Sequence, residues 1–287
     1  MSTLTICEPR AQAQLADQPI QEWIQPDGSR WAICHRVPGG YVMRFPGFAD
    51  FEISHDARSV ACHPVAETGQ QTLEHIYRNQ VLPMVLGRQG ALTFHGCAVE
   101  IGSQAAVFMG QSGLGKSTLA LSFATNGFRF LADDGLVIDD AGDEVDVVPG
   151  HPSIRLWHDS KDALAPRDAD EAAGLAFTSK CRINAGRSIV FCDQPRRLSA
   201  VYFLENEAAK DVQLERIRPA DALIRWVQHS FLLDVEDTDL VAGHFERVTK
   251  LATKIPCYRL DFPRRFEQLH AVRQVIADNV CSDTEAA

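Results

Sequence analysis

The sequence predicts an α/β protein with a phosphate-loop (P-loop) nucleotide-binding core, a β-rich N-terminal region and a helical C-terminal tail. Three observations lead to this fold class. The core is indicated by "GQSGLGKS", which fits G-x-x-x-x-G-K-[ST] and lies between a predicted strand and a predicted helix. Short β-like segments separated by turn residues fill 20–65, whereas segments with helical spacing of apolar residues dominate after Pro219.

The N-terminal region predicts a small antiparallel sheet followed by a helix. Its strands are "RWAICHRV", "YVMRF", "DFEIS" and "SVACHPV", and the breaks "QPDGS", "PGG" and "PGF" between them are typical of turns. The helix extends from residue 67 to about residue 86. We expect Thr68 to cap this helix, Gly87 to end it and Pro83 to kink it or stop it early.

The core begins with two strands, "ALTFHGCAVEI" and "QAAVFMG", joined by a short turn at Gly102-Ser103. The second strand leads into the phosphate loop. A helix over 117–126 follows and ends before Gly127. The next strand, "FRFLA", carries two adjacent carboxylates, Asp133 and Asp134, to its end.

The rest of the chain continues with strands and then helices. We expect strands at "GLVID", "DEVDVVPG", "SIRLW" and "RLSAVYFLE", with an exposed helix or loop over 160–175. The tail contains the helices "PADALIRWVQHSFLL" and "DTDLVAGHFERVTKLATKI", the strand "CYRLDF" and a last helix from about Pro263. Trp157 and Trp226 are interpreted as core aromatics, and the two "PRR" segments, 195–197 and 263–265, as surface loops.

Length and composition favour two domains in the cytoplasm. At 287 residues the chain exceeds the usual single domain, so we expect a β-rich domain over 1–88 and a catalytic domain with the phosphate loop and C-terminal helices over 89–287. The net charge of −10 argues against a nucleic-acid partner. There is no signal-peptide pattern and no window near ~18 apolar residues, so no membrane association is expected. Eight scattered cysteines without a CxxC pair indicate free thiols in a reducing compartment.

The phosphate loop predicts binding of ATP or GTP. Its glycines let the backbone approach phosphate oxygens, and its N–H groups and the start of the following helix face the anion. Lys116 would reach the β- and γ-phosphates, and the Ser117 hydroxyl would hold Mg²⁺. The expected nucleotide-binding residues are Gly110, Gln111, Ser112, Gly113, Leu114, Gly115, Lys116, Ser117 and Thr118.

The aspartate pair lies unusually close to the loop, because Ser117 and Asp133 are only sixteen positions apart. One short helix and one return strand therefore bring the pair back beside the loop. Two neighbouring side chains at a strand end can diverge, so one can serve Mg²⁺ while the other faces a phosphate acceptor. That division suits phosphoryl transfer, which needs a metal to neutralise charge and a base to position the attacking hydroxyl.

The segment "HGCAVEIGSQAAVFMGQSGLGKSTLALSFATNGFRFLADD" resembles the catalytic core of the bacterial HPr serine kinase/phosphorylase family. That family shares its nucleotide-binding core with ATP-dependent phosphoenolpyruvate carboxykinase. The resemblance implies ATP and Mg²⁺ as cofactors, Asp133 as the base toward a protein serine, and Asp134 with Ser117 around Mg²⁺. It also implies that His95 lies beside the carboxylates and the acceptor.

Two further comparisons with that family bear on the acceptor. The glycine-rich stretch that follows an Ile-Arg in the HPr kinases is absent, and "HPSIRLW" stands at about that place. The segments "KCRIN", "IRPADALIRWVQHSF" and "IPCYRLDFPRRF" are similar to HPr-kinase-related proteins of ribosomal peptide pathways, among them kinases of the C-terminal serine of lasso-peptide precursors. We therefore expect a peptide or small-protein acceptor with a serine, recognised by the domain over 1–88 unless that domain serves assembly into a homo-oligomer.

Two cations downstream of the core complete the candidate catalytic set with Lys116, His95 and Asp133. Lys180 and Arg182 alternate in "KCRIN", so their side chains would share one face of a strand and supply positive charge to a phosphoryl-transfer transition state. A serine kinase is the leading hypothesis. A small-molecule kinase or carboxykinase-like enzyme, and a nucleotide-regulated binding protein, remain as alternatives.

Overall fold

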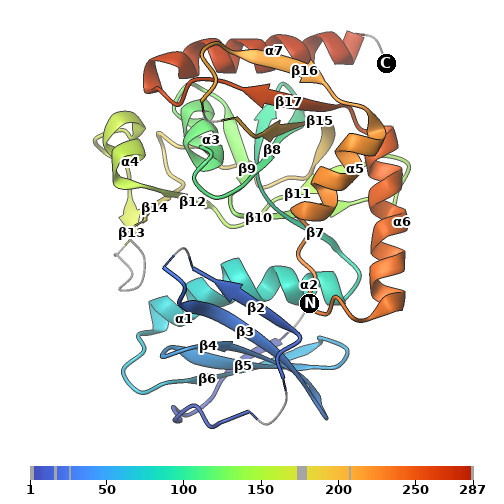
Figure 1. Cartoon of the computed structure of the whole chain (residues 1–287). Coiled ribbons are helices and arrows are strands. Elements are labelled where there is room, and N and C mark those ends of the chain that lie inside the picture. Colours follow the sequence, from blue (N-terminus) through green and yellow to red (C-terminus); the bar gives the residue numbers. More distant parts are fainter. Residues whose placement is uncertain (1–2, 16–17, 26, 173–179, 207, 286–287) are drawn as a thin grey trace. The chain divides into compact units, whose positions relative to one another are not determined.

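The structure, a computed structural model, describes residues 3–15, 18–25, 27–172, 180–206 and 208–285 (Figure 1). It divides into two compact units. The first combines Met1–Ala91 with Phe231–His244, and the second combines Leu92–Ser230 with Phe245–Ala287. The sequence places the division after residue 88, close to the first of these boundaries. It did not predict that Phe231–His244 would belong to the first unit.

The first unit contains a six-stranded sheet. The four central strands agree with the predicted ones, while the two edge strands are short segments without a clear alternating pattern and were not predicted. Strand β1 at one edge pairs in parallel with β6, and all other neighbours are antiparallel. The order across the sheet is β1 (Thr3–Ile6), β6 (Ser59–Pro64), β5 (Ala49–Ser54), β4 (Gly40–Phe45), β3 (Arg30–Val37) and β2 (Gln21–Ile24).

The helical segment after this sheet differs from the prediction at Thr68 and at Gly87, and it does not stop at Pro83. It consists of α1 (Gln70–Ile76), a π-helical turn (Tyr77–Val81) and α2 (Leu82–Arg88). The wider turn immediately precedes Pro83, whose ring cannot donate a hydrogen bond, so the chain continues helically instead of stopping. Gly69, not Thr68, is the N-cap residue, because the Thr68 hydroxyl donates to the Phe48 carbonyl at 3.0 Å. The helix continues through Gly87.

Buried polar contacts hold Phe231–His244 in the first unit. The carboxylate of Asp234 accepts hydrogen bonds from the Arg36 guanidinium at 2.7 Å and from the Tyr41 hydroxyl at 3.0 Å. Burial opposes ionisation of this carboxylate, but the hydrogen bonds from Arg36 and Tyr41 outweigh it and lower the pKa of Asp234. A second ion pair joins Arg88 and Asp237. These partners are far apart in sequence, which explains why pattern analysis missed the segment.

We predict that Asp234→Asn destabilises the protein by about 1–3 kcal/mol at neutral pH, because it removes the buried charge to which Arg36 and Tyr41 donate. Urea unfolding followed by tryptophan fluorescence measures the change. The folded pKa of Asp234 is depressed, so its contribution is present above the unfolded pKa and is lost as the pH falls through the folded value. The difference between wild type and variant should therefore shrink in acid.

The control for this variant is Glu236→Gln. Glu236 is 60% exposed and lies 3.4 Å from the same Arg36, so its removal should change stability by less than about 0.5 kcal/mol. Equal effects of the two substitutions would contradict the assigned role of Asp234.

The second unit is built on an eight-stranded mixed sheet. Strand β8 lies between antiparallel β7 and parallel β15, and β17 is parallel to β15 on the far side. Three parallel neighbours therefore end at the same edge of the sheet. The strands are β7 (Leu92–Ile101), β8 (Gln104–Gly110), β9 (Arg129–Ala132), β10 (Gly135–Asp139), β11 (Asp146–Val148), β15 (Arg196–Leu204), β16 (Gln213–Arg216) and β17 (Cys257–Asp261), with a small sheet of β12 (Ser153–Leu156), β13 (Glu171–Ala172) and β14 (Cys181–Asn184).

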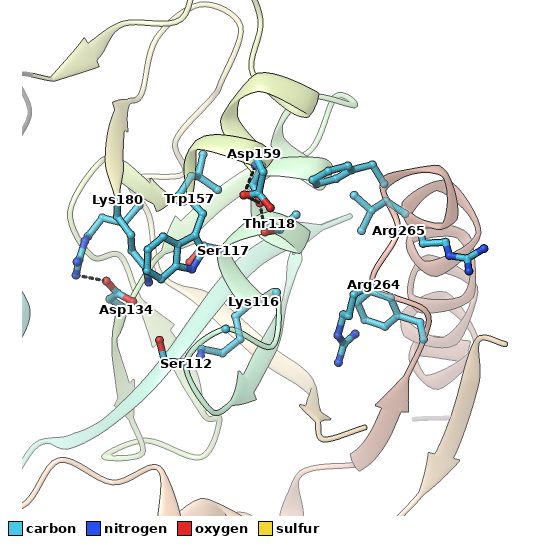
Figure 2. Close-up of a pocket in the computed structure, with 18 of the residues that line it drawn as sticks. Ser112, Lys116, Ser117, Thr118, Asp134, Trp157, Asp159, Lys180, Arg264 and Arg265 are labelled. Atoms are coloured by element: carbon cyan, nitrogen blue, oxygen red, sulfur yellow. Dashed lines mark hydrogen bonds and ion pairs between the residues drawn. The ribbon is translucent and has the colours of Figure 1, made fainter. Parts of the chain in front are cut away.

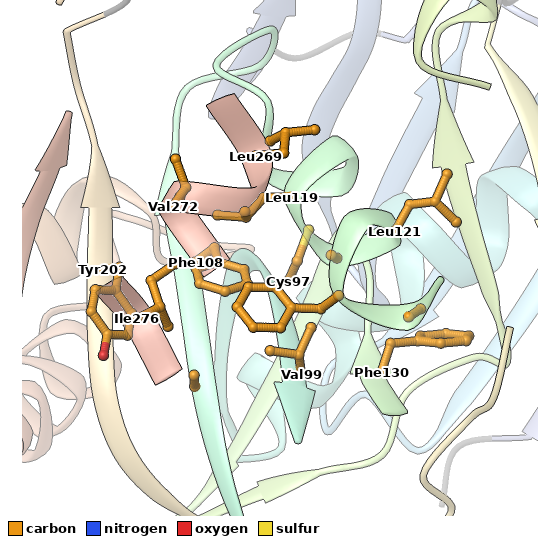
Figure 3. Close-up of a cluster of buried hydrophobic side chains, with 14 of the residues drawn as sticks. Cys97, Val99, Phe108, Leu119, Leu121, Phe130, Tyr202, Leu269, Val272 and Ile276 are labelled. Atoms are coloured by element: carbon orange, nitrogen blue, oxygen red, sulfur yellow. The ribbon is translucent and has the colours of Figure 1, made fainter. Parts of the chain in front are cut away.

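Helices cover both faces of this sheet (Figure 1). Alternate residues of β8 point to opposite cores: Phe108 packs with α3 (Lys116–Ala124) and α7 (Leu269–Glu285), as Figure 3 shows. Val107 packs on the other face with α5 (Pro219–Gln228) and the second half of α6 (Thr238–Lys254). The remaining helical segments are α4 (His158–Leu164) and η2 (Phe266–Gln268). The mixed α/β class, the N-terminal sheet and the C-terminal helix are confirmed.

Several smaller predictions can also be compared with the structure. Trp226 is fully buried in the second core, as predicted. All eight cysteines are free thiols. Among the helices in the described parts of the chain, none combines the length and the apolar character needed to cross a bilayer. Part of the predicted helix or loop over 160–175 lies outside the described residues, since 173–179 are not among them.

Candidate functional site

The phosphate loop connects the end of β8 to the start of α3 and depends on glycine at three positions. Gly113 and Gly115 have φ values of +91° and +86°, in a backbone region that residues other than glycine rarely adopt. Gly110 lies against β15, where a Cβ atom would be only 2.6 Å from the Leu204 carbonyl oxygen. The loop thus has the local geometry that its sequence pattern predicts.

Lys116 lies at the start of α3 and is buried. Its Nζ donates to the carbonyl oxygens of Gly110 at 2.7 Å and Gln111 at 3.0 Å, so the side chain folds back across the loop. Burial lowers the pKa of Lys116, because the ammonium has lost water. A bound polyphosphate would offset that loss of hydration.

A cavity opens beside the loop (Figure 2). Six of the nine predicted nucleotide-binding residues line it: Ser112, Gly113, Gly115, Lys116, Ser117 and Thr118. The other three, Gly110, Gln111 and Leu114, are outside its described lining. Leu114 packs against the core, and the other two contribute the carbonyls that hold Lys116.

The two aspartates point to different surroundings. Asp133 is buried beneath the loop, where it accepts hydrogen bonds from the Cys97 thiol at 2.9 Å, the Arg155 backbone N–H at 2.7 Å and the Ser117 hydroxyl. Asp134 lines the cavity and forms an ion pair with the Arg155 guanidinium at 2.7 Å. Its φ of +66° is strained for a non-glycine residue and directs it away from Asp133.

The environment shifts the pKa values of the two carboxylates in opposite directions. Burial, followed by the nearby charge of Asp134, raises the pKa of Asp133. Burial also works against ionisation of Asp134, but Arg155 and other positive neighbours overcome it and lower its pKa. Asp134, the carboxylate that faces the cavity, is therefore the more readily ionised of the two.

These contacts bear on the roles expected for the pair. The sequence resemblance implies Asp134 on the metal side with Ser117 and Asp133 on the acceptor side. In the structure, Asp133 bonds to Ser117 and Asp134 lies in the cavity with Lys180. The contacts thus differ from the pairing of Asp134 with Ser117 that the resemblance implies, whereas the catalytic roles of the two aspartates stay predictions.

His95 also lines the cavity. It lies within β7, opposite Gly135 in β10, so strand pairing brings it next to Asp134. Its backbone N–H donates to the His229 carbonyl at 2.7 Å. Burial and the charge of Lys116 lower the pKa of His95 to about 4, so the imidazole is neutral near pH 7.

The two predicted cations, Lys180 and Arg182, are separated. Lys180 lines the cavity with its Nζ 5.3 Å from the centre of the Trp157 ring. It precedes β14, which begins at Cys181, so the expected common strand face does not apply. Arg182 is opposite Arg155 in the pairing of β14 with β12, and the described lining of the cavity contains Arg155 but not Arg182.

Sequence analysis did not assign several residues of the cavity, and it placed three of them elsewhere. Arg264 and Arg265, interpreted as surface-loop residues, line it together with Trp157, which is 45% exposed and not a core aromatic. The two arginines follow β17, whose carboxyl end is at the same sheet edge as the phosphate loop. No local pattern encodes the neighbour relation of β8, β15 and β17, although two arginines directly after a strand were an available signal.

The fold and the site together describe an α/β phosphate-loop protein, and comparison with known proteins narrows this class. The chain is 40% identical over 61 residues to the HPr kinase/phosphorylase of Prosthecochloris aestuarii and 36% identical over 61 residues to that of Chlorobium phaeobacteroides. Each match covers 21% of this chain and 18% of the relative, so the similarity spans less than a fifth of either curated protein. No family model matches the chain.

The chain also resembles solved structures, as the next comparison shows for one of them. The Hpr(Ser) kinase/phosphatase from Coxiella burnetii aligns with 68% of this chain and 94% of its own, at a TM-score of 0.34 and 12% identity. The 61-residue sequence matches give the chain a distant and partial similarity to the HPr kinase/phosphorylase family.

We predict that Lys116→Ala weakens the binding of Mg-ATP about 10–100-fold, because it removes a charge-assisted hydrogen bond to phosphate. Isothermal titration calorimetry measures the affinity. Lys250→Ala is the matched control, because Lys250 is 70% exposed and pairs only with Glu246 on the same helix among the contacts described. Equal affinity in the Lys116 variant and wild type would contradict the phosphate-loop assignment.

Proposed function

We propose that the protein is an ATP- and Mg²⁺-dependent kinase that transfers the γ-phosphate to a serine hydroxyl of a peptide or small protein. The observation that carries this proposal is the composition of one cavity. It contains the phosphate loop with Lys116, and beside the loop a carboxylate, Asp134, with the cations Lys180 and Arg155. A protein that only bound the nucleotide would not need this second set of charged groups.

The residues present suit a magnesium ion held between protein and nucleotide. Mg²⁺ takes hard oxygen ligands, commonly one or two from the protein with the rest from phosphates and water. The Ser117 hydroxyl and the Asp133 carboxylate, already joined by a hydrogen bond, would provide that protein side. When bound, the ion would neutralise charge on the phosphates.

On the acceptor side, Asp134 would take the proton of the attacking hydroxyl. Its charge is maintained by Arg155, and the neutral imidazole of His95 can hydrogen-bond to the same hydroxyl. Lys116 and Lys180 would offset the charge that develops on the transferred phosphoryl group. Burial opposes ionisation of Asp134, but Arg155 and other cations keep its pKa low, so the carboxylate is charged and able to accept this proton.

For the acceptor we propose the C-terminal serine of a lasso-peptide precursor. The similarity of the C-terminal segments to such kinases motivates this choice. The cations near Asp134 support it, since a carboxylate beside the reacting serine would find Lys180 within the same cavity. The curated relatives are themselves described as kinases, which supports the class of reaction.

For the N-terminal unit we propose recognition of the rest of the peptide. In the described part of the chain, β1 and β2 form the two edges of its sheet, and each carries an exposed apolar residue: Ile6 is 47% exposed and Ile24 is 54% exposed. An extended peptide can add to such an edge through backbone hydrogen bonds, with side chains filling neighbouring apolar positions.

Peptide acceptors test the proposed function directly. We expect a precursor-length peptide ending in serine to be phosphorylated with Mg-ATP, and its alanine counterpart to remain unmodified, as detected by mass spectrometry. A short peptide with the same last residues should react less efficiently. Ile24→Lys should lower the phosphorylation of the long peptide toward that of the short peptide and leave the phosphorylation of the short peptide unchanged. No phosphoserine on any serine peptide, with ATP binding intact, would reject the kinase proposal.

The two aspartates should fail differently. Asp134→Asn should lower turnover by about 10²–10⁴-fold with little change in the magnesium requirement, because the amide cannot accept the proton. Asp133→Asn should instead raise the magnesium concentration needed for half-maximal rate, because an amide is a poorer partner for a hard cation. Magnesium titrations of the peptide reaction distinguish the two variants. The opposite pattern would restore the roles implied by the family resemblance, and unchanged kinetics in both would remove the chemical basis of the proposal.

A further inference from the structure

The cavity continues past the phosphate loop to the segment that follows β17. Phe262, Arg264, Arg265, Phe266 and Leu269 from this segment line it. Figure 2 shows Arg264 and Arg265 on the α7 side of the cavity, with Lys116 and Thr118 between them and Asp134. The cavity is therefore longer than the phosphate loop and the acceptor groups require.

We propose that this segment completes the nucleotide site, with Arg264 binding the polyphosphate and Phe266 with Leu269 holding the base. The inference rests on the proposed use of a nucleotide. It assigns to the chain's own C-terminal segment a role that the loop motif alone does not specify.

Arg264 is held where a phosphate group would arrive. Its Cδ lies 3.9 Å from the position of a Cβ on Gly115, so the side chain passes directly over the loop. Its guanidinium stacks on the Phe262 ring at 3.9 Å from the ring centre, which fixes the plane of the group. A planar guanidinium with a fixed orientation suits phosphate oxygens, which it can bind through two N–H groups at once.

The position of the base follows from the direction of the loop. A phosphate loop places the γ-phosphate near its lysine and the α-phosphate nearer the helix that follows. Asp134 and Lys180 occupy the γ-phosphate side, so the nucleoside belongs at the opposite end. That end carries Phe266, which is 37% exposed, and buried Leu269. An exposed aromatic ring beside an aliphatic side chain can stack on the flat, apolar face of a base.

Calorimetry with three ligands in the presence of Mg²⁺ tests the two halves of the proposal. The ligands are ATP, inorganic triphosphate and adenosine, measured on the full chain without any acceptor. Arg264→Ala should lower the affinity for ATP and for triphosphate about 10–100-fold and leave the affinity for adenosine unchanged. Phe266→Ala should lower the affinity for ATP and for adenosine about 5–100-fold and leave the affinity for triphosphate unchanged. Phe266→Trp keeps an aromatic face and should retain the wild-type affinity for ATP.

Glu267→Ala is the matched control, because Glu267 is exposed on the same short turn and is not part of the described lining. The proposal is overturned if the Arg264→Ala and Phe266→Ala variants bind ATP as tightly as this control. It is also overturned if Phe266→Ala lowers the affinity for triphosphate as strongly as the affinity for ATP. The result is independent of phosphoryl transfer. If the variants show the expected pattern of ligand affinities but the wild type phosphorylates no peptide, the kinase proposal is rejected and this site is supported. If the wild type phosphorylates the peptide and neither substitution changes that reaction, the kinase proposal is supported and this site is rejected.

Discussion

A single buried carboxylate, Asp133, holds the parts of the site together. It accepts hydrogen bonds from Cys97 in β7, from Ser117 in α3 and from the backbone of Arg155 in β12. Burying a carboxylate is costly unless its lone pairs are satisfied, so these three donors must stay in place for the fold to tolerate it. The three elements are thereby fixed relative to the phosphate loop, since the loop ends at α3.

The contact with Arg155 has a second consequence. The backbone N–H of Arg155 donates to Asp133, and the guanidinium of the same residue pairs with Asp134. Two residues later, Trp157 lies in the cavity beside Lys180. The small sheet that carries Arg155 thus supplies one wall of the cavity. A dense network of this kind explains the strained backbone of Asp134, because the surrounding contacts determine where its carboxylate must lie.

The parallel strands provide the other organising constraint. In β8, β15 and β17 the carboxyl ends share one edge of the sheet, and in open α/β sheets that edge is where ligands bind. The phosphate loop leaves this edge from β8, and the segment with Arg264 leaves it from β17. Two segments about 150 residues apart in the sequence therefore meet at one cavity, because the strand order makes them neighbours.

The sequence by itself determined the elements whose signals are local. Glycine spacing identified the phosphate loop, because left-handed φ values and close backbone contacts exclude other residues at Gly110, Gly113 and Gly115. Alternating and helical patterns located most strands and helices, since one face of each must be apolar to reach a core. Only the tertiary structure decided which aspartate touches Ser117, that Arg264 and Trp157 line the cavity, and that Asp234 binds within the first unit. Those contacts depend on strand order and on pairs distant in the chain, and neither leaves a periodic or compositional signal in a single sequence.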